Sequence, residues 1–396
     1  MTTLTVGVPC EDAPGERRVA LTPDGVGRLE RVGLTVLIEA GAGTAAGIPD
    51  TAYTAAGARV VAREDLFLDA EVLVCVRPPG DTGRLHEGHT LIGLLQPLVH
   101  PGLAADLAEA KVTVISLDML PRTLSRAQSM DALTSQANVA GYKAVIVAAD
   151  AYHSYFPMLM TAAGTTRPAQ VLVVGAGVAG LQAIATARRL GALVTGYDVR
   201  DAARGDIAST GAAVLDLAML VRVSESSGYA NQLIAAQRAA QQEAMDAAIA
   251  RFDVVITTAQ VPGGPPPLLI GPAGLASLKP GSVVVDLACG PLGGNVSGSV
   301  PDTTVVIGNG VTVIGAGNLA AQVPGAASTA YSRNIAAVLA YLVRDGVLGL
   351  DPADEVCAGV VIARDGEIVH PQVRAALADQ QKADQQKTGQ QKRARS

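Results

Sequence analysis

The stretch Val171-Leu-Val-Val-Gly175-Ala-Gly177-Val-Ala-Gly180-Leu-Gln182 decides the fold that this sequence predicts. Its first four residues are apolar and three of them are β-branched, which indicates a buried parallel strand, and a helical apolar period resumes at Val178. The glycines therefore lie at a strand-to-helix turn, the setting of a dinucleotide-binding fingerprint. We expect Gly175 to allow the tight turn, Gly177 to admit a pyrophosphate, and Gly180 to let the helix pack on the strand.

A second predicted strand ends in an acidic residue that fits the same motif. Residues 193–197 read Leu-Val-Thr-Gly-Tyr, and Asp198 follows the glycines by about twenty residues. A carboxylate there can accept hydrogen bonds from both ribose hydroxyls and would repel a 2′-phosphate, so the pairing favours NAD(H). A purely structural glycine turn remains the alternative, because the chain contains 43 glycines.

Length and composition predict a two-domain globular protein. The chain has 396 residues, enough for two domains of ordinary size with separate cores. Hydrophobic residues make up 49% and charged residues 17%, a balance typical of a packed interior rather than of a disordered chain. The net charge of −6 offers no basic face as a whole, so we expect no nucleic-acid partner.

The cysteines and the apolar windows indicate a cytoplasmic enzyme without a metal site. The first residues lack the basic region and apolar run of a signal peptide, and no window has the roughly twenty uninterrupted apolar residues of a membrane span. The cysteines lie far apart without CxxC spacing, which favours reduced thiols over disulfides or zinc ligands: Cys10, Cys75, Cys289 and Cys357.

Alternating strands and helices predict a doubly wound parallel sheet in a first domain, residues 1–130. One helix starts at Pro23 and Asp24, and another covers 101–110. We expect residues 326–378 to return to this domain through a helix over 326–343 and a hairpin that turns at Asp365-Gly366. The predicted strands are 4–9, 34–39, 58–61, 71–76, 90–94 and 112–116.

A second α/β domain is predicted for residues 131–325. It begins with a connecting helix over 131–154, which Asp131 or Ser129 could cap. Asn309-Gly310 predicts a type I′ hairpin between strands 305–307 and 311–314. The other predicted elements are strands 170–174, 193–197, 213–215, 253–257 and 282–286 and helices 178–190 and 230–250.

The end of the chain, residues 379–396, changes character. It is rich in Gln and Lys, and its composition cannot bury enough apolar surface for a packed fold, so we expect a disordered tail. This segment is either a solubilising end or a weak electrostatic tether.

Several stretches across the ordered chain resemble the alanine dehydrogenase and transhydrogenase superfamily. Segments 125–142 and 156–164 closely resemble the NAD(H)-binding subunits of proton-translocating NAD(P) transhydrogenases. The resemblance implies two Rossmann-like domains of the formate/glycerate dehydrogenase type with a cleft between them, a homodimer, and NADH in that cleft. The stretches shared with alanine dehydrogenases are Gly7-Val-Pro, 18–23, the glycine fingerprint, Asp198-Val-Arg200, Gly228-Tyr-Ala, 256–259 and Asp286-Leu-Ala.

The resemblance also implies partners. These are a membrane-embedded proton-translocating subunit and a domain that binds NADP(H) and exchanges hydride with NADH. The chain stops soon after the predicted hairpin at Asp365-Gly366, which implies a separate soluble subunit. We expect it to associate peripherally with the inner (cytoplasmic) membrane through these partners.

Three residues resemble the family's nicotinamide-proximal loop: Arg122, Gln128 and Asp131. Their implied roles are to hold the carboxamide and to orient the ring through hydrogen bonds. Thr134 matches a small hydroxyl residue near the nicotinamide. The structural alternatives are that Asp131 caps the connecting helix, that Thr134 is a packed helix residue and that Arg126 is a solvated loop charge.

The resemblance places further cofactor contacts around the glycine turn. Gly228 and Tyr229 resemble a loop that closes over bound nucleotide, although glycine beside an aromatic is also common in ordinary loops. Arg200 either covers the adenine or pairs with Asp198. The remaining implied contacts are Val178, Val199, Gln241, Ala259 and Gln260, with Gln242 as the alternative to Gln241.

An NAD-dependent alanine dehydrogenase is the alternative function. That reaction removes a proton as well as a hydride and needs an acid or base. Arg18 matches the family's arginine, but its lysine and aspartate positions hold Arg77 and Cys289. The histidine position falls at or near Gln96, although His100 lies four residues on. Hydride transfer between two nicotinamides moves no proton and needs only positioning. A nucleotide-binding regulatory subunit without chemistry is a third possibility.

Overall fold

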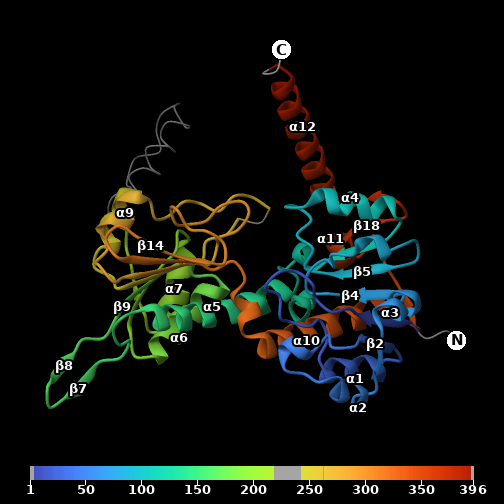
Figure 1. Ribbon diagram of the computed structural model, residues 1–396, viewed down its shortest axis with the longest axis horizontal. Helices are drawn as coiled ribbons and strands as arrows, with labels where there is room; N and C mark the ends of the chain where they lie inside the picture. Colours follow the sequence, from blue (N-terminus) through green and yellow to red (C-terminus); the bar gives the residue numbers. More distant parts are fainter. Residues whose placement is uncertain (1–3, 218–241, 262, 394–396) are drawn as a thin grey trace. The chain divides into compact units, whose positions relative to one another are not determined.

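The computed structural model describes residues 4–217, 242–261 and 263–393, and the chain falls into two compact units (Figure 1). Unit 1 comprises Met1–Gln136 and Ala321–Ser396, and unit 2 comprises Ala137–Ala320. The boundaries expected from the sequence are 131 and 325. The first boundary instead falls inside helix α5 (Ala132–Ala151), because the first turn of α5 is hydrogen-bonded to residues of unit 1.

Unit 1 contains an eight-stranded sheet with the order β19-β18-β6-β5-β4-β1-β2-β3. Strands β1 to β6 are parallel, and β18 and β19 add an antiparallel edge. The strands are β1 (Thr5–Val8), β2 (Thr35–Glu39), β3 (Arg59–Val61), β4 (Val72–Val74), β5 (Thr90–Gly93), β6 (Thr113–Ser116), β18 (Val361–Arg364) and β19 (Glu367–Ile368). The sheet matches the doubly wound prediction.

Both faces of this sheet are buried, as the apolar strand sequences predict. Successive side chains of a strand point to opposite faces, so Leu91 and Ile92 belong to different core clusters. Tyr331 is fully buried in the cluster that contains Ile92. The covering helices are α1 (Pro23–Arg31), α2 (Asp50–Ala55), α3 (Arg63–Asp69), α4 (Pro101–Glu109), α10 (Pro324–Leu342), α11 (Glu355–Val360) and the first turns of α12 (Pro371–Arg393).

Unit 2 contains a seven-stranded sheet with the order β11-β10-β9-β12-β13-β15-β14. The chain runs outward from β9 through β10 to β11 and then resumes at β12 on the other side of β9. Ligands of open α/β sheets bind at such a reversal, outside the carboxyl ends of the strands. The elements are β9 (Gln170–Val174), α6 (Val178–Arg189), β10 (Leu193–Tyr197), α7 (Asp201–Ser209), β11 (Ala213–Val214), β12 (Val254–Thr257), α9 (Pro272–Ser277), β13 (Val283–Asp286), β14 (Thr303–Ile307) and β15 (Val311–Gly315).

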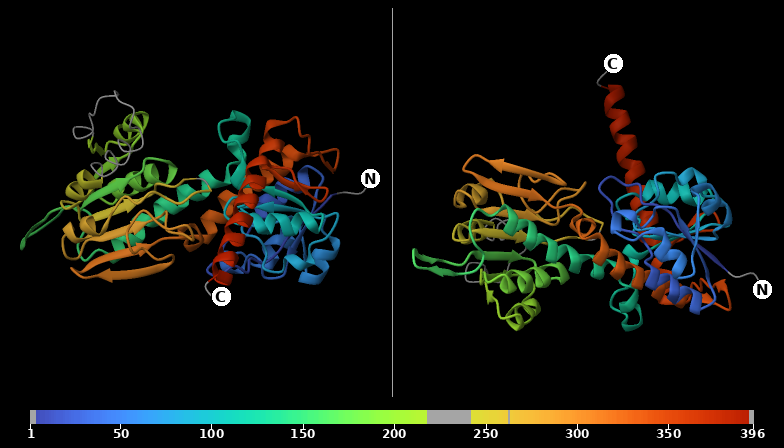
Figure 2. Two further views of the ribbon diagram at one scale, coloured as in Figure 1. Left: turned by 90° about the horizontal axis from the view of Figure 1, so that it is seen from above. Right: turned by 60° about the horizontal axis from the view of Figure 1, so that its bottom comes forward.

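Two small hairpins lie outside these sheets. Strands β7 (Leu159–Thr161) and β8 (Gly164–Thr166) form a two-stranded hairpin that extends away from the sheet of unit 2 (Figures 1 and 2). Strands β16 (Val343–Arg344) and β17 (Val347–Leu348) form another in unit 1. The predicted helix over 230–250 lies partly outside the described residues, and residues 242–249 are helical.

The Asn309-Gly310 hairpin forms, but its turn type was predicted wrongly. Strands β14 and β15 pair in antiparallel register with Ile307 opposite Val311, which leaves a three-residue loop. Only Gly310 in this loop has a positive φ, 81°, whereas a type I′ turn needs positive φ at both central residues. By contrast, Asp365 and Gly366 both have positive φ and form a two-residue turn between β18 and β19.

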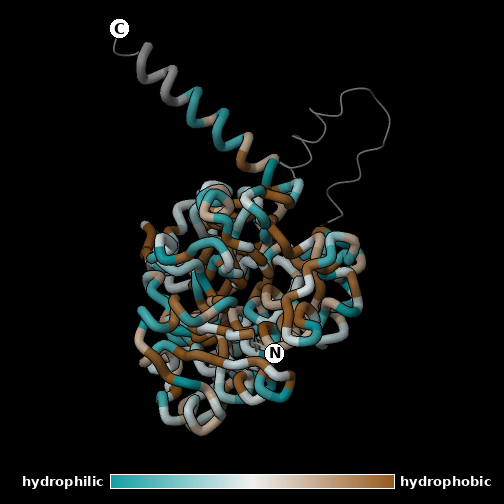
Figure 3. The backbone as a smooth tube through the Cα atoms, turned by 90° about the vertical axis from the view of Figure 1, so that its right-hand side faces the viewer, coloured by the Kyte–Doolittle hydropathy of each residue, from teal (hydrophilic) through white to brown (hydrophobic). Residues whose placement is uncertain are grey.

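The Gln/Lys-rich segment also differs from its prediction, because α12 continues through Arg393. Gln, Lys and Ala have high helix propensity, and Val373, fully buried in unit 1, anchors the start of the helix. The composition lacks the apolar surface for a packed core, but it does not oppose a local helix. Figure 3 shows hydrophobic residues in the first turns of α12 and hydrophilic residues in the coloured turns that follow.

Among the described residues, no helix combines the length and the apolar character that crossing a bilayer requires. The four cysteines form no disulfide, and three of them are buried.

Candidate functional site

The glycine turn between β9 and α6 has two glycines that the fold itself requires. Gly175 has φ 99°, and its N–H donates to the Tyr197 carbonyl oxygen at 2.7 Å. A Cβ on Gly180 would lie 1.8 Å from the Gly175 carbonyl oxygen, so any side chain there would separate α6 from the turn. These two positions therefore need glycine for backbone geometry alone.

Gly177 differs from the other two glycines. Its φ of −80° and ψ of −168° are accessible to any residue, and no described atom lies within 4 Å of a Cβ built there. It directly precedes α6, whose first N–H groups have no partner inside the helix. The open space faces a helix N-terminus, which suits an anionic phosphate group. Val178, the first residue of α6, is partly exposed at the same end.

Asp198 lies beside this turn at the carboxyl end of β10. Its Oδ2 accepts the Ala176 N–H at 2.7 Å, and its side chain is only 7% exposed. The Arg200 backbone N–H and Nε both donate to Oδ1 at 2.9 Å. Burial disfavours the charged carboxylate, but the hydrogen bonds from Arg200 and Ala176 outweigh burial and lower the pKa of Asp198 to about 2. Val199, between them, is exposed.

The turn after β12 packs directly against the glycine turn. The Thr258 hydroxyl donates to the Gly175 carbonyl oxygen at 3.1 Å. Ala259 is held by Asn295, whose Oδ1 accepts the Ala259 N–H at 3.0 Å and whose Nδ2 donates to the Ala259 carbonyl oxygen at 2.8 Å. The exposed Gln260 donates to the Leu287 carbonyl oxygen. Sequence reasoning missed Thr258 and Asn295, because no local pattern marks a contact 36 residues away.

The predicted nicotinamide-proximal residues lie on one loop of unit 1, around the 3-10 helix η4 (Ser125–Met130). Asp131 accepts the Thr134 backbone N–H at 2.8 Å and the Thr134 hydroxyl at 2.6 Å, so it caps α5. Arg122 Nε lies 3.7 Å from Asp131 Oδ2. The structure thus brings Arg122, Asp131 and Thr134 together.

Gln128 adjoins that cluster through its backbone, because its carbonyl oxygen accepts the Asp131 N–H at 3.3 Å. Its side chain is exposed and has no hydrogen-bond partner among the described residues. Arg126, expected from the sequence to be a solvated loop charge, is exposed and pairs with the exposed Glu355 at 2.7 Å. Gly228, Tyr229 and Gln241 lie outside the described residues.

Three of the four residues at the alanine dehydrogenase positions lie in unit 1. Arg18 is buried, its Nε and Nη2 pair with Glu16 at 2.7 and 2.6 Å, and its Nη1 donates to Gln136 at 2.8 Å. Arg77 Nε lies 3.8 Å from Glu16 Oε2. Gln96 uses its backbone N–H to bind Asp118 at 2.9 Å. The exception is Cys289, which belongs to unit 2.

Burial favours the protonated, uncharged form of a thiol and a carboxyl group at and near these positions. Burial raises the pKa of the Cys289 thiol, which therefore stays protonated at neutral pH. Burial also raises the pKa of Glu11 to about 8, although the Val76 and Arg77 N–H groups donate to its carboxylate. Glu11 is thus neutral over most of the physiological range.

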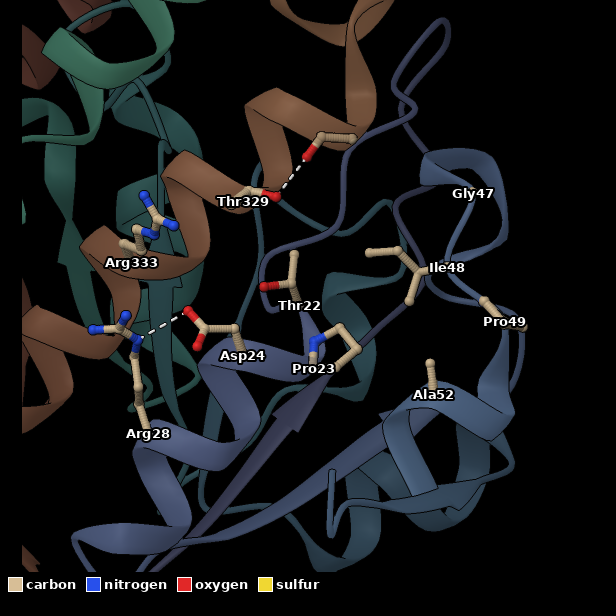
Figure 4. Close-up of a pocket in the computed structure, with 11 residues that line it drawn as sticks. Thr22, Pro23, Asp24, Arg28, Gly47, Ile48, Pro49, Ala52, Thr329 and Arg333 are labelled. Atoms are coloured by element: carbon tan, nitrogen blue, oxygen red, sulfur yellow. Dashed lines mark hydrogen bonds and ion pairs between the residues drawn. The ribbon is translucent and has the colours of Figure 1, made fainter. Parts of the chain in front are cut away.

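An open pocket of about 670 Å³ in unit 1 is distinct from the positions considered so far (Figure 4). It lies between the start of α1, residues 47–52 and α10, and Arg28 pairs there with Asp24 at 3.0 Å. None of the predicted cofactor contacts lines it.

Comparison with known proteins agrees with the two-unit architecture. The model of the Alanine dehydrogenase/PNT N-terminal domain matches residues 7–140, and that of the C-terminal domain matches residues 144–371. The second match ends in unit 1, in line with the return of the chain to that unit.

Transhydrogenase subunits are more similar to the chain than alanine dehydrogenases. It is 41% identical over 375 residues to NAD(P) transhydrogenase subunit alpha of Cereibacter sphaeroides, covering 93% of this chain and 71% of that protein. A crystal structure of transhydrogenase from Sinorhizobium meliloti superposes with a TM-score of 0.83 at 40% identity, covering 92% of this chain and all of that one. Alanine dehydrogenase of Mycobacterium tuberculosis is 34% identical over 310 residues, 76% of each chain. The chain belongs to the Alanine dehydrogenase/PNT family.

Proposed function

We propose that this chain is the NAD(H)-binding alpha subunit of a proton-translocating NAD(P) transhydrogenase. It holds NADH on unit 2 and exchanges hydride with NADP⁺ on a partner. The observation that carries the proposal is the glycine turn, where open space at Gly177 faces the N-terminus of α6 and Asp198 lies hydrogen-bonded to the same turn. The pyrophosphate would bind at the helix terminus and the adenosine ribose at the carboxylate.

The contacts assigned to this nucleotide are the residues around the turn. Val178 lies at the pyrophosphate, Val199 and Arg200 border the ribose, and Ala259 and Gln260 form the turn held by Asn295. Gly228, Tyr229 and Gln241 complete the set from outside the described residues. Arg122, Gln128, Asp131 and Thr134 would hold the carboxamide and orient the nicotinamide ring.

The residues at the dehydrogenase positions support direct hydride transfer over amino-acid oxidation. Arginine and glutamine side chains are poor general bases, and burial keeps the Cys289 thiol protonated. No general base therefore stands at the positions where an alanine dehydrogenase carries its lysine, histidine and aspartate. Hydride exchange between two nicotinamides needs none.

The proposal includes partners of stated kinds. An NADP(H)-binding domain receives the hydride, and a membrane-embedded subunit couples the transfer to proton translocation, so the chain would sit at the cytoplasmic face of the inner membrane. A homodimer is also proposed. The exposed apolar side chains Tyr155, Met158 and Met160 on and before the β7–β8 hairpin support a protein contact there.

Two measurements test the proposal. Titration of the purified chain with NADH, followed by nucleotide fluorescence, should saturate, whereas NADPH should bind much more weakly because Asp198 opposes a 2′-phosphate. When membranes that carry the partner subunits are added, NADPH should reduce an NAD analogue. Saturable NADH binding without hydride exchange would instead support a regulatory subunit.

Alanine dehydrogenase is a second candidate, favoured by the buried Arg18 and by the 34% identity to the Mycobacterium tuberculosis enzyme. Its test uses the chain alone with NAD⁺ and L-alanine. We expect no sustained formation of NADH. Turnover without any partner protein would overturn the transhydrogenase proposal.

A further inference from the structure

Asn334 is a buried polar residue on α10 that contacts the loop predicted to hold the nicotinamide. The residue is only 7% exposed. Its Nδ2 donates to the Ser129 carbonyl oxygen at 2.8 Å, and its Oδ1 accepts the Ser135 hydroxyl at 2.7 Å. Both hydrogen bonds span about half of the chain, with sequence separations of 205 and 199 residues.

The two contacts of Asn334 lie on either side of Asp131. Ser129 belongs to η4, and Ser135 lies in the first turn of α5. One amide therefore ties together the end of η4 and the start of α5, and Asp131 is the residue at the corner between them. Ala127 and Met130 are buried beneath the loop, whereas the Arg126–Glu355 ion pair is exposed.

The neighbouring polar residues of α10 serve a different segment. Ser328 accepts the Val19 N–H at 2.9 Å, and Ser332 accepts the Thr22 N–H at 3.0 Å. Tyr331 and Ile335 pack in the hydrophobic core. Asn334 is thus the buried side chain of α10 that hydrogen-bonds to both η4 and α5 among the described residues.

We propose that Asn334 is a positioning residue, which sets the Gln128–Asp131 loop in the geometry that hydride transfer requires. Burying an amide costs free energy unless its donors and acceptors are paired, and here each end of the amide is paired to a different segment of the loop. An apolar side chain at position 334 would leave the Ser129 carbonyl oxygen without this partner. The segment around Asp131 would then no longer be fixed by α10. The inference rests on the proposed function, because it assigns the geometry of this loop a role in hydride transfer.

The test compares Asn334→Leu with Ser332→Ala as the matched control. Both variants remove buried hydrogen bonds made by α10, but only Asn334→Leu affects the loop. Ser135→Ala removes one of the two contacts of Asn334, together with the hydrogen bonds of the Ser135 hydroxyl to Gln136 and Ala132. For each full-length variant the NADH dissociation constant, the rate of NADPH-driven reduction of an NAD analogue with partner membranes, and the amide hydrogen exchange of residues 128–134 are measured.

For Asn334→Leu we expect a fall in the hydride-transfer rate of about tenfold or more, because misplacement by about 1 Å costs this much. The NADH dissociation constant should stay close to that of Ser332→Ala, since the glycine turn is untouched. Exchange at the Asp131 and Thr134 amides should accelerate in Asn334→Leu and not in Ser332→Ala. Ser135→Ala should give an intermediate rate.

Equal hydride-transfer rates and equal exchange in Asn334→Leu and Ser332→Ala, with an active wild-type chain, would overturn the positioning role alone. A parallel loss of NADH binding and of transfer in Asn334→Leu would also overturn it, because that pattern reports general unfolding. Absence of hydride transfer in the wild-type chain would overturn the proposed function and this inference with it.

Discussion

Arg200 and Asp198 form a bidentate ion pair, with Arg200 Nε and Nη2 each donating at 2.9 Å to a different carboxylate oxygen of Asp198. Together with the N–H groups of Ala176 and Arg200, these bonds occupy the acceptor positions of the carboxylate. The Arg200 side chain is 63% exposed and can therefore leave. Ribose hydroxyls can bind to Asp198 only after the guanidinium has moved.

Replacing Asp198 and Arg200 separately tests this exchange. We predict that Asp198→Ala weakens NADH binding by about 1–3 kcal/mol, because the ribose loses its acceptor. Arg200→Ala should leave the affinity unchanged or raise it, because no guanidinium has to be displaced. Fluorescence titration measures both. If Arg200→Ala weakened binding as much as Asp198→Ala, the contact of Arg200 with the nucleotide would contribute more than the displacement of its guanidinium costs.

Gly177 and Gly180 should separate binding from folding. Gly180→Ala forces a Cβ onto the Gly175 carbonyl oxygen and should destabilise the protein by about 1–3 kcal/mol. Gly177→Ala meets no described atom, so the melting temperature should stay the same while NADH affinity falls, because the methyl group occupies the phosphate space. Calorimetry and titration distinguish the two. Normal NADH affinity in Gly177→Ala would place the pyrophosphate elsewhere.

Asp131 combines a structural and a proposed chemical role, and two substitutions divide them. Asn is as good a helix N-cap as Asp, so Asp131→Asn should keep the stability of the wild type. Asp131→Ala should lose about 1 kcal/mol of stability. Hydride transfer should fall in both variants, because each removes the charge that faces Arg122. Full hydride-transfer activity in Asp131→Asn would show that Asp131 serves only as the N-cap of α5.

Glu11 gives the protein a pH-dependent stability. Its pKa in the folded state is about 8 instead of 4.5, so between these values the folded protein retains a proton that the unfolded chain releases. The stability that this group provides is complete below pH 4.5 and is lost as the pH rises toward about 8. Calorimetry across this range should show a decline, and Glu11→Gln should flatten it. An unchanged slope in Glu11→Gln would assign the decline to another group.

The β7–β8 hairpin should contribute to self-association. Met160 is 73% exposed on β7, and Met160→Asp should shift the protein toward the monomer, because it places a charge in an apolar contact. Leu68→Asp on α3 is the control, since Leu68 is 78% exposed but lies in unit 1. Sedimentation velocity measures both. Equal dimer content in the two variants would exclude the hairpin as an interface.

Local patterns were sufficient for the elements that carry the site. The strand Gln170–Val174, the glycine turn and α6 follow from β-branched runs, glycines and helical periodicity, all within about twenty residues. Predictions from local sequence were wrong where the same residues are compatible with two different structures. Asn-Gly is compatible with either a two-residue or a three-residue loop, and a Gln/Lys-rich segment is compatible with either disorder or an exposed helix.

By itself the sequence determined the fold class and the nucleotide fingerprint, because residue identity and short spacings encode them, whereas the residues at the dehydrogenase positions follow only from the resemblance to the family. Three contacts were decided by the tertiary structure alone. Arg200 pairs with the Asp198 carboxylate, Asn295 hydrogen-bonds to Ala259, and Asn334 hydrogen-bonds to both η4 and α5. The last two join segments 36 and 205 residues apart, and no local period records which buried amide meets which backbone. Arg200 and Asp198 are close in sequence, but their ion pair forms only when the folded turn places the carboxylate within reach of the guanidinium.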